Sequence, residues 1–141
     1  MVLAVSGVVL ANSAIGILIF QQPDTPGSSL FPLPFLALVN WATLSVVGAI
    51  YIILTELKKD AHQLQGAWGV LGAYIPLILV SVFSFGSFAL VSALLLLIPT
   101  ILLSIRYKNS LSPRLWLMVL IGVGINWIVL FSLIVLDRFI F

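Results

Sequence analysis

The chain has 141 residues, of which 62% are hydrophobic and 7% are charged. Because soluble domains carry about 25% charged residues, so few charges cannot cover a water-exposed surface, and we expect one all-α transmembrane domain over residues 1–141. The net charge of +2 rests on scattered basic residues, which argues against nucleic-acid binding, and the lack of cysteine excludes disulfides and thiolate metal sites.

The first predicted element is a helix over residues 2–20. About 20 apolar residues are needed to cross a hydrocarbon core that is about 30 Å thick. No Lys or Arg precedes this run, whereas a signal peptide carries a basic segment before its apolar core. We therefore expect a retained transmembrane helix. Residues 21–34 contain four prolines and one glycine, and they predict a loop.

A second helix is predicted over residues 35–54, followed by a polar loop over residues 55–66. The single histidine, His62, lies in this loop beside Asp60. Because bis-histidine haem and zinc centres need further ligands, we expect a solvated side chain. The sequence therefore predicts no metal site and no cofactor.

Residues 67–105 are too long for one crossing. As a single helix they would measure about 58 Å, nearly twice the hydrocarbon core. We predict two helices joined by a tight turn around Gly86, flanked by Ser84 and Ser87. Glycine tolerates the positive φ of a turn, and serine bonds nearby backbone. A re-entrant pair that does not cross fully is the alternative.

A fifth helix is predicted over residues 114–136. With five crossings, the two basic connections lie on one side of the membrane, and Arg138 lies on the other. Cytoplasmic loops are rich in Lys and Arg, so we expect the N-terminus inside and the C-terminus outside. One crossing by residues 67–105 would divide the basic residues almost evenly. The residues predicted on the cytoplasmic side are Lys58, Lys59, Arg106, Lys108 and Arg114.

Polar residues inside the predicted helices are few, and none is ionisable near a helix centre. Proton-coupled transport usually needs such a group, and the chain offers no acid pair, catalytic triad or phosphate loop. We therefore expect no enzymatic activity. Carboxamides in hydrocarbon prefer partners, and small residues permit close helix contact. The predicted helix-helix or partner contacts are Asn12, Asn40, Trp41, Asn126, Trp127, Gly7, Ala11 and Gly122.

These observations favour a non-catalytic integral subunit of a larger membrane protein complex, in a plasma membrane or an internal energy-converting membrane. Its predicted partners are the lipid bilayer and other membrane subunits. The alternative is a small oligomeric channel or carrier, whose path is lined by the three asparagines and the serines of residues 81–92. A protein that contacts a pigment or a quinone is a third possibility.

Overall fold

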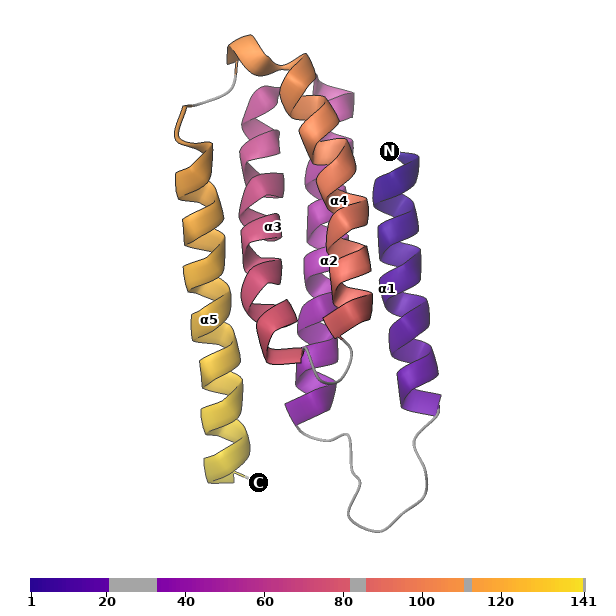
Figure 1. Cartoon of the computed structure of the whole chain (residues 1–141), viewed down its shortest axis with the longest axis vertical. Helices are drawn as coiled ribbons and strands as arrows, with labels where there is room; N and C mark the ends of the chain where they lie inside the picture. Colours follow the sequence, from indigo (N-terminus) through magenta and orange to yellow (C-terminus); the bar gives the residue numbers. More distant parts are fainter. Residues whose placement is uncertain (21–32, 82–85, 111–112, 141) are drawn as a thin grey trace.

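The computed structural model describes residues 1–20, 33–81, 86–110 and 113–140. Within these ranges the chain is helical and contains no strand, so the predicted all-α class is confirmed. Figure 1 shows the long helices side by side, alternating in direction. The elements are α1 (Val2–Phe20), α2 (Leu33–Lys58), α3 (Ala61–Ser81), α4 (Gly86–Arg106), the 3₁₀ turn η1 (Lys108–Ser110) and α5 (Leu115–Ile140).

Four of these helices, α2 to α5, are long and apolar enough to cross a membrane. The remaining long helix, α1, has the predicted bounds. Its apolar stretch within the described side chains is shorter and covers Ala4–Ile17. Both α2 and α5 contain 26 residues and extend past their predicted ends. At 1.5 Å per residue each measures about 39 Å, which reaches into the head-group region. The length of the apolar run alone therefore predicts both helices too short.

The predicted loop over residues 55–66 is wrong for most of its length, because only Lys59 and Asp60 lie between α2 and α3. Lys59 ends α2 with a left-handed backbone, at a φ of 51°. Asp60 then caps α3, since its carboxylate accepts a hydrogen bond from the His62 backbone N–H at 2.9 Å. Polar composition suggested a loop, but a cap and a buried Leu64 extend the helix instead.

The predicted turn around Gly86 falls partly outside the described residues, which exclude Ser84. Gly86 and Ser87 are the first two residues of α4 rather than members of a turn. A proline lies inside each neighbouring helix, Pro76 in α3 and Pro99 in α4. Neither ends its helix, which is consistent with the tolerance of transmembrane helices for proline.

The most buried of the four candidate spans is that of α3, which packs against α2, α4 and α5. Half of the α3 span is buried, compared with 17% of the α5 span. Helix α1 packs against α2 and α4 at the opposite edge from α5 (Figure 1). Large side chains fill the interior, and Trp41, Tyr74 and Leu38 are at most 1% exposed.

A glycine seam, formed by Gly69 and Gly72 of α3 and Gly122 of α5, brings these two helices into backbone contact. A Cβ atom added to Gly122 would collide with the Gly69 carbonyl oxygen, and one added to Gly72 would collide with the Val119 backbone. Close helix approach in lipid depends on such residues. Positions 72 and 122 therefore have no room for a side chain larger than hydrogen, whereas a Cβ atom at Gly69 would make an ordinary contact with the Met118 carbonyl oxygen.

Candidate functional site

One polar side chain that joins several helices is that of Asn126, which is 3% exposed on α5. Its Nδ2 donates a hydrogen bond to the Ala73 carbonyl oxygen of α3 at 2.5 Å. Its Oδ1 accepts one from the Asn40 Nδ2 of α2 at 2.9 Å. One carboxamide thus joins three helices, at a depth where lipid offers no competing partner.

A second polar cluster joins α1, α3 and α4. The Tyr74 hydroxyl lies 3.2 Å from the Ser92 Oγ, and Ser92 in turn donates to the Gly7 carbonyl oxygen at 3.5 Å. Either hydroxyl can be the donor in the contact between Tyr74 and Ser92. The Ser45 and Trp41 side chains of α2 lie close to the same hydroxyl. All four side chains are at most 1% exposed.

A third contact ties α3 to α4 nearer the basic end. The Trp68 indole donates to the Ser104 Oγ at 3.0 Å, and Ser104 donates to the Thr100 carbonyl oxygen at 2.7 Å. Other hydroxyls bond carbonyls of their own helices, including those of Thr55 and Ser81. The buried polar groups of the described residues thus divide between bonds that link helices and bonds within one helix.

The remaining predicted contact residues behave differently. Asn12 is exposed, and its Nδ2 donates to the Val8 carbonyl oxygen of its own helix at 2.8 Å, so it does not join the other asparagines. Ala11 is fully buried on α1. A Cβ atom at Gly7 would lie 3.3 Å from the Leu95 Cβ, which marks close contact between α1 and α4.

The two Asn-Trp pairs are oriented in opposite ways. In α2, Trp41 is fully buried, while Asn40 is half-buried. In α5, Asn126 is buried and Trp127 is 44% exposed. The same dipeptide therefore presents its tryptophan to the interior in one helix and to the surroundings in the other.

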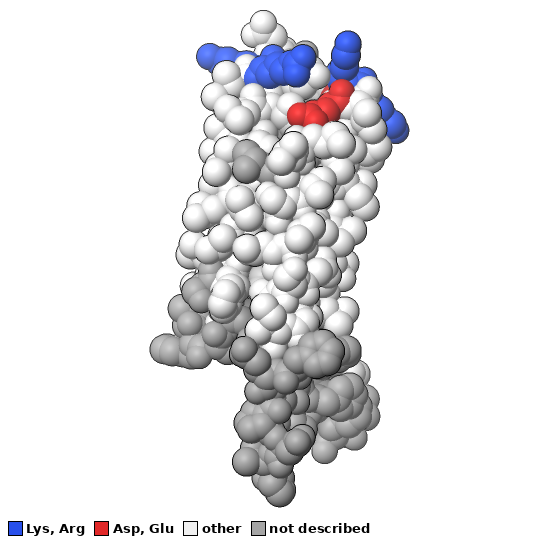
Figure 2. Space-filling model, turned by 90° about the vertical axis from the view of Figure 1, so that its right-hand side faces the viewer, with Lys and Arg blue, Asp and Glu red and all other residues white. Residues whose placement is uncertain are grey.

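Basic side chains gather at one end of the bundle, as the blue atoms of Figure 2 show. Helices α2 and α4 end there, and α3 and α5 begin there (Figure 1). The opposite end carries Arg138, in the last turn of α5. The residues predicted to share a side lie at this end: Lys58, Lys59, Arg106, Lys108 and Arg114.

The hollows of the described bundle are mostly apolar. One of about 300 Å³ lies among α3, α4 and Val119 of α5. Its two polar-tipped side chains, Trp68 and Tyr74, hydrogen-bond to Ser104 and Ser92. Among the described residues, no three His, Asp or Glu side chains are grouped to hold a metal ion.

Sequence reasoning missed four residues that organise the helix contacts. The sequence offers a signal for Gly69 and Gly72, which form a series with Gly66 at intervals of three. It places Ser92 only in a serine-lined path. Tyr74 had no signal of its own, because a tyrosine in an apolar run does not reveal which helices surround it.

Comparisons with known proteins found no matching family model, no matching curated protein and no matching solved structure.

Proposed function

We propose that this protein is a non-catalytic integral membrane subunit, which packs against a larger membrane protein complex through the outer face of α5. Trp127 carries the proposal. It is the thirteenth of the 26 residues of α5, so it lies at mid-span, and it is 44% exposed. Its indole N–H donates to no residue in the described part of the chain.

This position is unfavourable in lipid alone. Tryptophan prefers the membrane interface, where its ring meets hydrocarbon and its N–H meets water. Leaving a polar group without a hydrogen-bond partner in the hydrocarbon core costs on the order of 2–7 kcal/mol. A neighbouring protein helix that offers an acceptor removes this cost. The low burial of the α5 span supports the same conclusion.

Substitution of Trp127 by leucine tests this interface. The change keeps an apolar side chain but removes the donor and the ring, so we expect the affinity for the partner subunit to fall by about 30-fold or more, as for tryptophan hot spots. The measurement is quantitative mass spectrometry of chains that co-purify from native membranes in mild detergent.

Trp116→Leu is the matched control. Trp116 is the second residue of α5 and is 61% exposed at the basic end, where head groups and water satisfy its N–H. We expect this variant to retain the partner. Recovery of the wild-type chain as a lone monomer from native membranes would refute the accessory role.

We further propose five crossings, with α1 included, a tight connection between α3 and α4, and the basic end in the cytoplasm. The clustering of five basic residues at one end supports this orientation. The re-entrant alternative is disfavoured by α3 and α4, each of which contains 21 residues, about 32 Å of helix.

The cysteine-free chain permits a direct test of this topology. We expect a membrane-impermeant maleimide to label cysteines at positions 2, 59 and 108 from the cytoplasmic side only. A cysteine replacing Arg138 should react only from the other side. Labelling of positions 59 and 108 from opposite sides would contradict the arrangement. Labelling of position 2 from the outer side would show that α1 does not cross the membrane.

The channel or carrier alternative has less support. Asn40 and Asn126 bond each other, and Asn12 bonds its own helix, so these amides line no shared path within one chain. Ser92 is likewise engaged with Tyr74 and Gly7. Solute flux in liposomes that depends on Asn40 and Asn126 would restore this alternative.

A further inference from the structure

We propose that the chain holds an anionic phospholipid against α1, with the phosphate at Arg106. The site combines two adjoining hollows. The first, here called the α1 groove, measures about 740 Å³ and is lined by α1 side chains from Met1 to Ser13. The second, the Arg106 pocket, measures about 380 Å³ and is lined by Met1, Val2, Glu56, Pro99, Leu102, Leu103 and Arg106.

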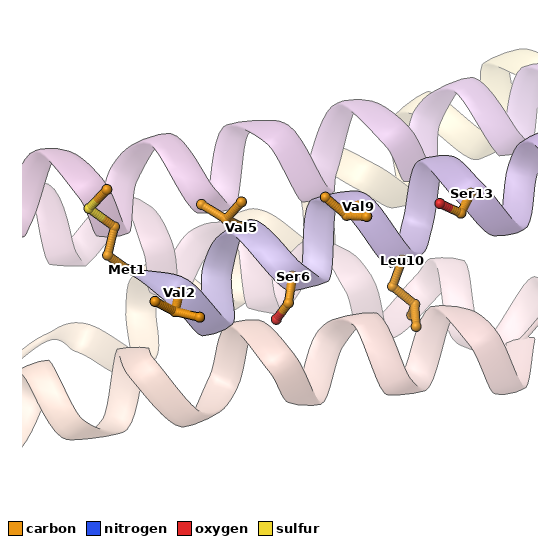
Figure 3. Close-up of a pocket in the computed structure, with 7 residues that line it drawn as sticks. All are labelled: Met1, Val2, Val5, Ser6, Val9, Leu10 and Ser13. Carbon is orange, nitrogen blue, oxygen red and sulfur yellow. The ribbon is translucent and has the colours of Figure 1, made fainter.

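The α1 groove has the chemistry and length of an acyl-chain site. Figure 3 shows its lining side chains, which are valines, a leucine and a methionine apart from Ser6 and Ser13. Residues 2 to 13 of a helix advance about 17 Å. This is close to half of the hydrocarbon core of about 30 Å. The groove therefore extends through one leaflet.

The Arg106 pocket has the chemistry of a head-group site. It shares Met1 and Val2 with the α1 groove, so the two hollows adjoin. Arg106 is the last residue of α4, its side chain is exposed, and it pairs with no carboxylate in the described ranges. A guanidinium binds phosphate oxygens in a bidentate manner.

The charge at this end favours an anionic lipid. The one carboxylate lining the pocket, that of Glu56, lies 3.4 Å from the Met1 ammonium, so the ion pair offsets its charge. The other basic residues of this end, Lys58, Lys59, Lys108 and Arg114, add to the positive charge there. Basic pockets between transmembrane helices bind anionic head groups in this way.

Titration of the purified full chain in neutral detergent, followed by native mass spectrometry, tests the site. The probes are phosphatidylglycerol, phosphatidylcholine with the same acyl chains, and glycerol 3-phosphate as the free head group. We expect phosphatidylglycerol to bind most tightly. Glycerol 3-phosphate should not compete with it, because it lacks the chains that fill the α1 groove.

Single substitutions distinguish a direct contact between Arg106 and the lipid phosphate from a general attraction by the positive charge of this end. Arg106→Gln should weaken phosphatidylglycerol binding about fivefold, toward the phosphatidylcholine value. Lys108→Gln removes the same charge from the same end but does not line the pocket, and it should change binding by less than about twofold. Val9→Phe places bulk in the α1 groove, so it should weaken both lipids.

Three results would overturn the proposal. Equal affinities for the two lipids would show that the head group does not contribute to binding. Equal losses in the Arg106 and Lys108 variants would indicate a diffuse field rather than a site. A second copy of the chain bound in place of lipid, and lost in the Val9 variant, would show that the groove is a dimer interface. Arg106→Lys keeps the charge but loses the bidentate guanidinium, so its affinity for phosphatidylglycerol should lie between those of the wild type and of Arg106→Gln.

Discussion

The Gly122→Ala variant is expected to lose about 3 kcal/mol of its free energy of unfolding, or to release α5 from α3 altogether. The added methyl group would collide with the backbone carbonyl of Gly69, which cannot rotate aside as a side chain can. Overpacking of this kind typically costs about 1–3 kcal/mol, and backbone collisions lie at the upper end. Reversible unfolding in mixed micelles measures the loss.

Gly124→Ala provides the matched control on the same helix. A Cβ atom at Gly124 meets nothing within 4 Å. Because alanine is the better helix former, this variant should be unchanged or more stable by about 0.5–1 kcal/mol. A similar loss in the two variants would show that the effect comes from α5 itself and not from the glycine seam.

Asn126→Leu should be the most damaging substitution of a polar side chain in the bundle. It removes the bonds to Asn40 and to the Ala73 carbonyl, and it leaves the Asn40 amide without this partner. Interhelical hydrogen bonds in membranes average about 0.6 kcal/mol and reach about 1.7. We therefore expect a loss of about 1–3 kcal/mol in the free energy of unfolding.

A double-mutant cycle with Asn40→Leu isolates the pair. Asn40→Leu alone should cost less, because Asn126 keeps its bond to Ala73. The coupling energy between the two substitutions should be about 0.5–1.5 kcal/mol. Strict additivity would mean that the Asn40–Asn126 bond contributes nothing, and an equal cost for the two single variants would mean that the Ala73 bond contributes nothing.

The existence and approximate extent of the helices could be predicted from the sequence, because apolar length is set by bilayer thickness. The bounds of α1 agree residue by residue. The loop prediction at residues 55–66 is wrong because most of these polar residues extend α2 and α3. The local chemistry of Lys59 and Asp60 ends one helix and caps the next within two residues.

The helix contacts were harder to predict, because they depend on how each helix is rotated about its axis. In a soluble helix an apolar stripe reports that rotation. In lipid both faces are apolar, so the signal is lost. The Asn-Trp pairs illustrate this limit: Trp41 is buried and Trp127 is exposed, although the two dipeptides are identical. Nor did residue types reveal that Asn126 would meet Asn40 while Asn12 would not.

The bond from Ser92 to the Gly7 carbonyl has a consequence for biosynthesis, because it joins residues 85 positions apart. At about 5–20 residues per second, the ribosome delivers Ser92 about 4–17 s after Gly7. During that interval α1 exists before its later neighbour α4 has been completed. The Asn12 Nδ2 donates to the Val8 carbonyl one turn earlier in the same helix, so this bond can form as soon as α1 has folded and needs no later part of the chain.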